Sequence, residues 1–381
     1  MPATVDVLLL AVADVTRDAR TINLARALAK DGVTVGIVGA GKQLHSTVAS
    51  EDSNITFFEW LDPGGRALRR WWSFNRCAAT LDVRARCVAA MDLFALSASR
   101  SIARRCKAHL LYDMREFYFA LGPLQGKGLR QRILAAHESR LVGNVDDVIV
   151  SGELDANIAQ KRFALAKRPV VLLNTPPYKD VVPSSLETVV TRNSHQSTSL
   201  SQKTLVLYQG VVHHGRGLAP FMNAMAVMPM VQLVVIGDGP ARHDLQALAE
   251  RLGVAHRVAW IGSVPYDELH QLTCGAHVGL CLIEPISMSY EYALPNKLFE
   301  YMMARVPSLV TDLPALHEHI IRHPVGVLVD PALTIDNIVL AMERVIHAET
   351  YTAMKHACEE IRNLSYERQA RTAVALFREH L

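Results

Sequence analysis

The residues best suited to chemistry lie in one short stretch, Pro295 to Met302, which reads PNKLFEYM. Proline favours the first position of a helix, and the free N–H groups and partial positive charge of a helix start attract phosphate. Lys297 adds an ammonium group, and Glu300 lies one turn later on the same face, where it could accept hydrogen bonds from sugar hydroxyls. The stretch therefore suits a nucleotide. The alternative is an ordinary helix start with a Lys–Glu pair.

A glycine-rich loop that contains an arginine follows an apolar run in the second half of the chain. The run Leu205–Gly210 leads into Gly215, Arg216, Gly217 and a helical pattern. Glycine lets a backbone approach a phosphate closely, and arginine can bind it with a planar fork of donors. The alternative is a plain turn with a surface arginine. Another tight turn at Gly237 follows the next apolar run.

The elements that position these residues are short apolar runs that alternate with helical patterns. Near-continuous apolar runs of this kind predict parallel strands covered on both faces. Two sets occur: 5–12, 33–38, 55–60, 145–150 and 170–173, then 205–208, 233–236, 258–261, 278–283, 308–310 and 325–329. The sequence therefore predicts an α/β protein with two Rossmann-like domains and a cleft between them, in which ligands bind at the carboxyl ends of the strands.

The domain boundaries follow from changes in composition. Residues 1–178 are predicted to form the first domain and residues 204–363 the second. Residues 179–203 are polar and rich in Ser and Thr, show no apolar face, and are predicted to be a linker. Residues from about 364 to 381 carry apolar side chains at helical spacing and predict an amphipathic C-terminal helix.

The overall composition excludes several classes of protein. The formal net charge of the 381 residues is +3, which does not indicate nucleic-acid binding. The six cysteines include no C-x-x-C pair, which argues against a zinc site and fits reduced thiols in the cytoplasm. The apolar run Val5–Val12 is too short to span a bilayer.

The PNKLFEYM stretch resembles the donor-site helix of retaining glycosyltransferases with the GT-B fold, family 4 (glycogen-synthase-like), of the bacterial polysaccharide type. The loop from Gly210 to Leu218 resembles the G-x5-R-G-L loop of that family, whose arginine contacts the donor diphosphate. The resemblance extends in order over about residues 5 to 330. It implies that the C-terminal helix crosses back onto the first domain.

The resemblance also implies a set of donor-site residues. Many family members carry two glutamates eight residues apart; here the second falls on Glu300 and the first on Tyr292, with Glu291 one residue out of register. The implied catalytic residues are Arg216 and Lys297, and the implied donor-binding residues are Gly210, Gly217, Gly237, Val264, Glu291, Asn296, Leu298 and Glu300.

In the resembled family the first domain binds the acceptor, which the sequence identifies only as a glycan or lipid-linked acceptor. Candidate residues at predicted strand ends and in the first helix are Arg20, Asp92, Asp113 and Glu116, with helix docking or capping as the alternative role. The stretch Arg66–Arg76 combines four arginines with three large aromatic residues. It suits an anionic membrane surface, or else an amphipathic helix with tryptophan in the core.

The expected function is transfer of a sugar, with retained configuration, from a nucleotide-sugar donor in surface polysaccharide or glycoconjugate biosynthesis. No cofactor and no metal ion is expected, because the chain carries neither an H-E-x-x-H nor a D-x-D pair at a strand end. Localisation is expected to be cytoplasmic, with peripheral attachment to the inner membrane face. The alternatives are a nucleotide-sugar 2-epimerase of the same fold and a non-catalytic partner subunit of a polysaccharide assembly complex.

Overall fold

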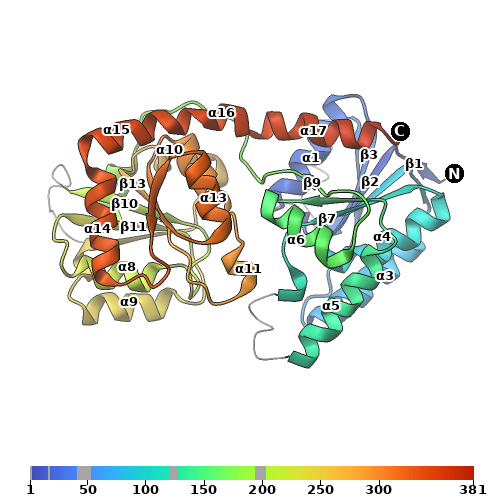
Figure 1. Ribbon diagram of the computed structural model, residues 1–381. Helices are drawn as coiled ribbons and strands as arrows, with labels where there is room; N and C mark the ends of the chain where they lie inside the picture. Colours follow the sequence, from blue (N-terminus) through green and yellow to red (C-terminus); the bar gives the residue numbers. More distant parts are fainter. Residues whose placement is uncertain (1, 16–17, 41–52, 121–127, 194–202) are drawn as a thin grey trace. The chain divides into compact units, whose positions relative to one another are not determined.

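The computed structural model describes residues 2–15, 18–40, 53–120, 128–193 and 203–381. It divides into two compact units: unit 1 is Met1–Asn174 with Glu367–Leu381, and unit 2 is Thr175–Tyr366. Each unit is a parallel sheet flanked by helices (Figure 1). The α/β class and the two Rossmann-like domains predicted from the sequence are confirmed.

Unit 1 contains a seven-stranded parallel sheet in the order β4-β3-β2-β6-β7-β8-β9. Its strands are almost wholly apolar and buried, because helices flank the sheet. A small parallel pair, β1 with β5, lies outside this sheet. The strands are β1 (Ala3–Thr4), β2 (Val7–Asp14), β3 (Val35–Ala40), β4 (Ile55–Glu59), β5 (Val83–Arg84), β6 (Cys87–Ala90), β7 (His109–Met114), β8 (Asp147–Val150) and β9 (Val170–Val171).

The helices of unit 1 come from both ends of the chain. The C-terminal helix α17 belongs to this unit, and its residues Ala373, Leu376 and Phe377 join the same buried cluster as strands β2 and β3. The helices are α1 (Ala19–Lys30), α3 (Ala67–Thr80), α4 (Leu93–Cys106), α5 (Gly128–Val142), α6 (Glu153–Phe163) and α17 (Tyr366–Arg378), with a 3-10 turn, η2, at Tyr118–Ala120.

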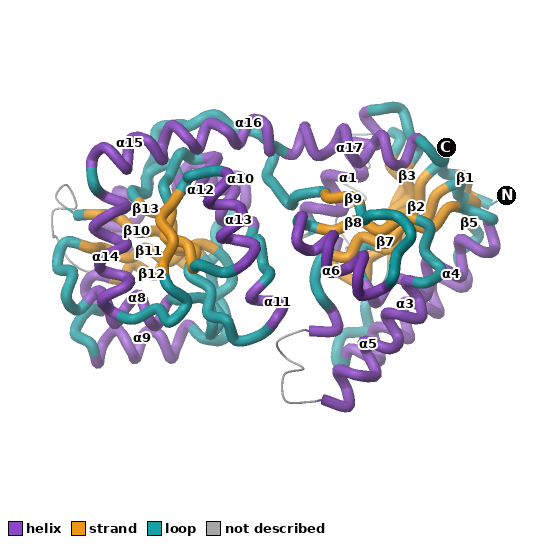
Figure 2. The backbone as a smooth tube through the Cα atoms, in the orientation of Figure 1, coloured by secondary structure: helices purple, strands orange, loops and turns teal. Residues whose placement is uncertain are grey.

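Unit 2 contains a six-stranded parallel sheet in the order β12-β11-β10-β13-β14-β15 (Figure 2). The chain builds outward from β10 to one side and then from β13 to the other. The neighbours β10 and β13 therefore form the switch point where this class of fold binds ligands. The strands are β10 (Thr204–Gln209), β11 (Val231–Ile236), β12 (Val258–Gly262), β13 (Val278–Cys281), β14 (Ser308–Thr311) and β15 (Gly326–Val329).

Helices connect successive strands of unit 2 and then continue along the chain toward α17. They are α7 (Leu186–Asn193), α8 (Leu218–Met225), α9 (Arg242–Arg251), α10 (Tyr266–Thr273), α11 (Met288–Glu291), α12 (Asn296–Met303), α13 (Pro314–Arg322), α14 (Ile335–Ile346), α15 (Ala348–Ala357) and α16 (Ile361–Leu364), with 3-10 turns η5 (Ala255–Arg257) and η6 (Cys358–Glu360).

The prediction that residues 179–203 form a linker is wrong for the middle of this stretch, which folds as helix α7 within unit 2. The polar composition of the stretch hides an apolar pair: Leu186 and Val190, one helical turn apart, are fully buried. Ser184 stabilises the start of α7, because its hydroxyl accepts a hydrogen bond from the Leu186 N–H at 3.0 Å. Residues 194–202 of the predicted linker lie outside the described residues.

Candidate functional site

The predicted donor-site residues of unit 2 come from the carboxyl ends of neighbouring strands. Gly210 follows β10, Gly237 follows β11, and the segment after β13 leads into α12 with Lys297 and Glu300. Because β10 lies between β11 and β13 in the sheet, these three connections meet at its carboxyl edge. The structure thus brings together the two motifs that the sequence singles out.

The glycines of this edge have backbone conformations and surroundings that exclude a side chain. Gly217 begins α8 with a φ of +72°, and a Cβ added there would lie 2.7 Å from the Leu282 carbonyl oxygen. Gly237 has a φ of +133°, and its Cβ would lie 2.0 Å from the carbonyl oxygen of Gly210. The loops therefore pack backbone against backbone, which leaves their N–H groups close to the strand ends.

Lys297 is buried, and its ammonium Nζ forms no hydrogen bond to any described residue. The ammonium lies 3.9 Å from the centre of the Tyr208 ring, a cation–π contact. The pKa of Lys297 is lowered from 10.5 to about 8, chiefly by burial and also by the positive charge of Arg216, against the opposing effects of Cys281 and Glu300. A buried ammonium in this state favours an anionic ligand strongly.

Arg216 is half-buried in the loop before α8. Its guanidinium lies 4.5 Å from the centre of the Tyr290 ring, which comes from α11. The distance is that of a cation–π contact, which helps to hold the guanidinium in place. The two cations of the site, Arg216 and Lys297, thus each form a cation–π contact with a tyrosine ring.

Glu300 belongs to a short chain of polar side chains that also involves β10 and α10. Gln209 donates a hydrogen bond from Nε2 to Glu300 Oε2 at 2.5 Å, and its Oε1 accepts one from the Thr273 hydroxyl at 2.9 Å. Burial raises the pKa of Glu300 above its usual value, while the bond from Gln209 and the charge of Lys297 act in the opposite direction. These hydrogen bonds hold the Glu300 carboxylate through its Oε2 atom.

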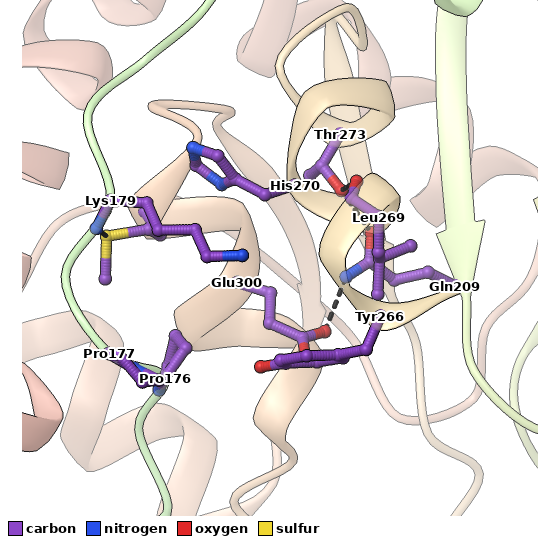
Figure 3. Close-up of a pocket in the computed structure, with 10 residues that line it drawn as sticks. Pro176, Pro177, Lys179, Gln209, Tyr266, Leu269, His270, Thr273 and Glu300 are labelled. Atoms are coloured by element: carbon purple, nitrogen blue, oxygen red, sulfur yellow. Dashed lines mark hydrogen bonds between the residues drawn. The ribbon is translucent and has the colours of Figure 1, made fainter. Parts of the chain in front are cut away.

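A pocket opens beside this carboxylate within unit 2 (Figure 3). Glu300 and Tyr266 line it next to one another, and the side chain of Lys179 extends toward them. The positive charge of Lys179 acts on the Glu300 carboxylate. The lining residues are Pro176, Pro177, Lys179, Gln209, Tyr266, Leu269, His270, Thr273, Glu300 and Met303.

The other residues predicted to bind donor have different surroundings. The side chain of Leu298 is fully buried in the core, and its N–H already bonds to the Pro295 carbonyl at 3.1 Å. Asn296 is exposed at the first position of α12, and Val264 is half-buried between β12 and α10. Glu291 ends the short helix α11 and is half-buried. Only main-chain atoms of Leu298 could take part in binding.

Sequence reasoning missed Tyr208, Gln209 and Thr273, which support the two charged residues of α12. The position of Gln209, a polar residue that ends an otherwise apolar strand directly before Gly210, was an available signal. No comparable signal exists for Thr273, because only the packing of α10 near α12 brings it to Gln209.

The acceptor-side candidates of unit 1 are engaged in contacts within the unit. Arg20 binds both carboxylate oxygens of Asp113, at 2.7 and 2.9 Å, and also the Leu172 carbonyl. Asp92 caps α4 by accepting from the Ala95 N–H at 2.8 Å, and it also accepts from the Val12 N–H. These contacts give Arg20, Asp92 and Asp113 structural roles at the carboxyl edge of the sheet.

Glu116 differs from the other three candidates, because it is exposed just after β7. The segment Arg66–Arg76 forms most of helix α3, with Arg66 at its N-cap. Phe74 is fully buried, whereas Trp72 is mostly exposed, at 59% of its surface. The alternative expectation placed either Trp71 or Trp72 in the core; Trp71 is half-buried and Trp72 is exposed. No helix in the described ranges is both long and apolar enough to cross a membrane.

Comparisons with known proteins match both the second unit and the overall fold. Residues 190–363 match the family model "Glycosyl transferases group 1". An alpha-D-kanosaminyltransferase from Streptomyces kanamyceticus is 27% identical over 139 residues, which cover 35% of this chain and 34% of that protein. The chain therefore spans about a third of the length of this curated relative.

Solved structures match over nearly the whole chain. A sucrose-phosphate synthase from Thermosynechococcus elongatus has a TM-score of 0.77 at 15% identity and covers 99% of this chain and 98% of its own. Anabaena HepE in complex with UDP-glucose has a TM-score of 0.71 at 14% identity and covers 98% of both chains. The chain therefore has the fold of GT-B glycosyltransferases, and its second unit carries the sequence pattern of the group 1 glycosyl transferases.

Proposed function

We propose that this chain is a retaining, metal-independent glycosyltransferase of family 4 that takes a sugar from a nucleotide-sugar donor. The observation that carries the proposal is the buried ammonium of Lys297, which has no hydrogen-bond partner in the described part of the chain and lies near a second cation, Arg216. Two cations at the carboxyl edge of a parallel sheet, beside a glycine loop, are suited to a diphosphate.

The chemistry follows from where charge develops. Cleavage of the sugar–phosphate bond leaves negative charge on the diphosphate and positive character on the sugar carbon. Arg216 and Lys297 stabilise that leaving group, which is the task a divalent metal performs in other transferases. The leaving phosphate oxygen then accepts the proton of the acceptor hydroxyl on the face from which it departs, so the configuration is retained.

Glu300 is proposed to bind the hydroxyls of the donor. Its carboxylate is fixed by Gln209, and the adjoining pocket offers the ring of Tyr266 and the cation of Lys179. A sugar or ribose hydroxyl could donate to the carboxylate while the diphosphate binds the two cations. HepE, a structural relative, is described in complex with UDP-glucose, which supports a nucleotide-sugar donor for this chain.

The deciding experiment follows the products formed from UDP-, GDP- and ADP-sugars in the presence of glycan or lipid-linked acceptors. A glycoside together with a free nucleoside diphosphate supports the transferase. An isomerised donor would identify a 2-epimerase, and diphosphate binding without turnover would identify a non-catalytic partner subunit.

The matching variants test the site itself. Arg216→Ala and Lys297→Ala should each lower kcat about a hundredfold or more, because a charge-assisted bond to the leaving group contributes about 3 kcal/mol in a closed site. Arg251→Ala, an exposed arginine at the end of α9, is the control and should keep full activity. Wild-type turnover in a folded Lys297→Ala protein would refute the assignment.

The acceptor is proposed to be lipid-linked, with the enzyme attached to the cytoplasmic face of an anionic membrane through helices α3 and α5. The two helices meet where the rings of Trp71 and His137 lie 6.2 Å apart. Exposed apolar and basic side chains alternate on them: Arg66, Leu68, Arg69, Trp72, Leu129, Arg130, Arg132 and Ile133. Apolar groups can enter the headgroup layer while each arginine contributes about 1 kcal/mol toward anionic lipid.

Flotation with liposomes tests this attachment. The protein should float with anionic vesicles at low salt and not with neutral vesicles, and a variant with Arg66 and Arg69 changed to Glu should stay in solution. The same charge change at Arg251 and Arg344, two exposed arginines of unit 2, is the control and should leave flotation intact. Failure to float on either lipid, with full activity on a water-soluble acceptor, would remove the membrane proposal and leave the transferase proposal standing.

A further inference from the structure

Two histidines and an aspartate gather at the amino edge of the unit 1 sheet. His109 is the first residue of β7 and Asp147 the first residue of β8, and these strands are parallel neighbours. His380 lies just beyond α17. The amino ends of two strands and the end of the C-terminal helix thus meet at one point, on the sheet edge opposite to the one where this fold binds ligands.

The polar atoms of the three side chains converge. Asp147 Oδ2 lies 2.7 Å from His109 Nε2 and 3.3 Å from His380 Nε2. All the candidate ligand atoms lie within 4.8 Å of one another. Asp147 is only 8% exposed, and the two imidazole rings are stacked with their centres 3.4 Å apart. The cluster is therefore compact and largely shielded from water.

Hydrogen bonding inside the protein accounts for only part of this arrangement, because His109 Nε2 and Asp147 Oδ2 are hydrogen-bonded at 2.7 Å whereas the second imidazole is not. His380 Nε2 is buried and forms no hydrogen bond to any residue that the structure describes, although buried polar atoms are nearly always bonded. The other nitrogen of His109, Nδ1, lies 3.6 Å from Asp146 Oδ2. A carboxylate near the far nitrogen is the usual support of a metal-binding histidine. A metal ion bound here would replace the proton that His109 Nε2 shares with Asp147 Oδ2.

We propose that His109, Asp147 and His380 bind one divalent transition-metal ion, of which Zn²⁺ fits the donor set best. Two imidazole nitrogens and one carboxylate oxygen are common zinc ligands, and water can take the fourth tetrahedral position. The ion would tie the end of α17 to the start of β7 and β8. The site belongs to unit 1, whereas Arg216 and Lys297 belong to unit 2, so this proposal is independent of the proposed glycosyltransferase activity.

Two local adjustments accompany binding. The imidazole planes are inclined by only 11°, so the rings must tilt for their lone pairs to converge on one ion. The ammonium of Lys167 lies 3.3 Å from Asp147 Oδ1. It is two-thirds exposed, at 67%, so it can move into solvent. The positive charge of Lys167 repels a metal ion, so a variant without this charge should bind the metal more tightly.

Metal titration of the full chain tests the site. The protein is stripped with EDTA, desalted and titrated with Co²⁺, whose tetrahedral complexes absorb visible light, and Zn²⁺ is then added as competitor. We expect one ion per chain and complete displacement by Zn²⁺. His109→Gln and His380→Gln should each weaken binding at least about tenfold, and Lys167→Gln should strengthen it. His256→Gln, an exposed histidine of unit 2, is the control and should bind as the wild type does.

Circular dichroism and thermal melting show which variants are folded. Absence of a one-to-one complex in the wild type would overturn the proposal, as would unchanged affinity in folded His109→Gln and His380→Gln. If a histidine variant does not fold, Lys167→Gln decides, because this substitution removes the lysine charge and leaves both imidazoles in place. Tighter metal binding by Lys167→Gln supports the site, and unchanged binding refutes it.

Discussion

At the scale of single residues, Lys297 is the most unusual group in unit 2. Its ammonium is buried against the Tyr208 ring and has no hydrogen-bond partner among the described residues, and the charge of Arg216 acts on it unfavourably. Perturbed charges of this kind cluster at functional sites, which is why this group supports the proposed binding of a diphosphate.

The cost should be measurable in the ligand-free protein. Lys297→Met keeps the side-chain volume and removes the buried charge, so it should raise the free energy of unfolding by about 1 to 3 kcal/mol at pH 7 while abolishing transfer. Urea unfolding with both proteins measures the difference. Equal stability of the two proteins at pH 7 would contradict the description of Lys297 as an uncompensated charge.

The same group sets a pH dependence whose sign can be stated. The pKa of Lys297 is about 8 in the folded protein and 10.5 in the unfolded chain, so between these values the unfolded state binds more protons. The free energy of unfolding of the wild type, relative to that of Lys297→Met, should therefore rise as the pH increases through this range. The stability advantage of the variant should disappear near the upper end of the range, at a pH of 10.5. A difference that stays constant with pH would show that Lys297 is not the titrating group.

At the scale of elements, the donor site depends on strand ends that stop in glycine. The turn after β11 passes so close to the turn after β10 that Gly237 has no room for a Cβ. The N–H of Gly237 is held by the Gly262 carbonyl at 2.8 Å, at the end of β12. Three adjacent strand ends are thereby joined by backbone contacts alone.

Substitution of one of these glycines should disturb the site much more than substitution of a comparable glycine elsewhere. Gly237→Ala should lower the free energy of unfolding by about 3 kcal/mol, because it adds a backbone clash to the strain of a positive φ. Gly253→Ala is the matched control: its φ is +68°, but nothing lies within 4 Å of the added Cβ, so the loss should be about 1 kcal/mol. Chemical denaturation compares them, and similar losses would show that the close approach is not important.

At the scale of the whole molecule, the chain separates its candidate sites between two units. The cations suited to a diphosphate belong to unit 2, and the exposed basic and apolar side chains of α3 and α5 belong to unit 1. The proposed donor chemistry and the proposed membrane attachment should therefore be separable by mutation.

Sugar transfer should not depend on a divalent metal. Arg216 and Lys297 supply the positive charge that the leaving group needs, so activity should persist in EDTA and should not increase with added Mg²⁺ or Mn²⁺. Product formation is measured well below the melting temperature. Any loss of stability that EDTA causes at the cluster of His109, Asp147 and His380 then does not affect the measured rate. Activity that disappears in EDTA and returns with Mg²⁺ would mean that the electrostatics of the site have been misread.

Patterns local in the chain were sufficient to predict the fold and the principal site motifs. Apolar runs such as Leu205–Tyr208 predict buried parallel strands, because a strand covered on both faces has no face exposed to water and therefore carries few polar side chains. The sequence also indicated that a helix begins beside Pro295, which lies at the N-cap of α12 and not at its first helical position as expected. It indicated as well that Arg216 lies in a glycine loop, since caps and turns depend on a few consecutive residues.

Only the tertiary structure decided which side chains are satisfied and which are not. The sequence could not show that Arg20 is bound to Asp113, that Gln209 fixes Glu300, or that Lys297 has no hydrogen-bond partner within the described ranges. Helix α7 was missed for a related reason, because its buried face consists of very few residues in a polar stretch. Each of these outcomes depends on residues that are far apart in the chain and meet only when strands and helices pack, and no local periodicity encodes such a meeting.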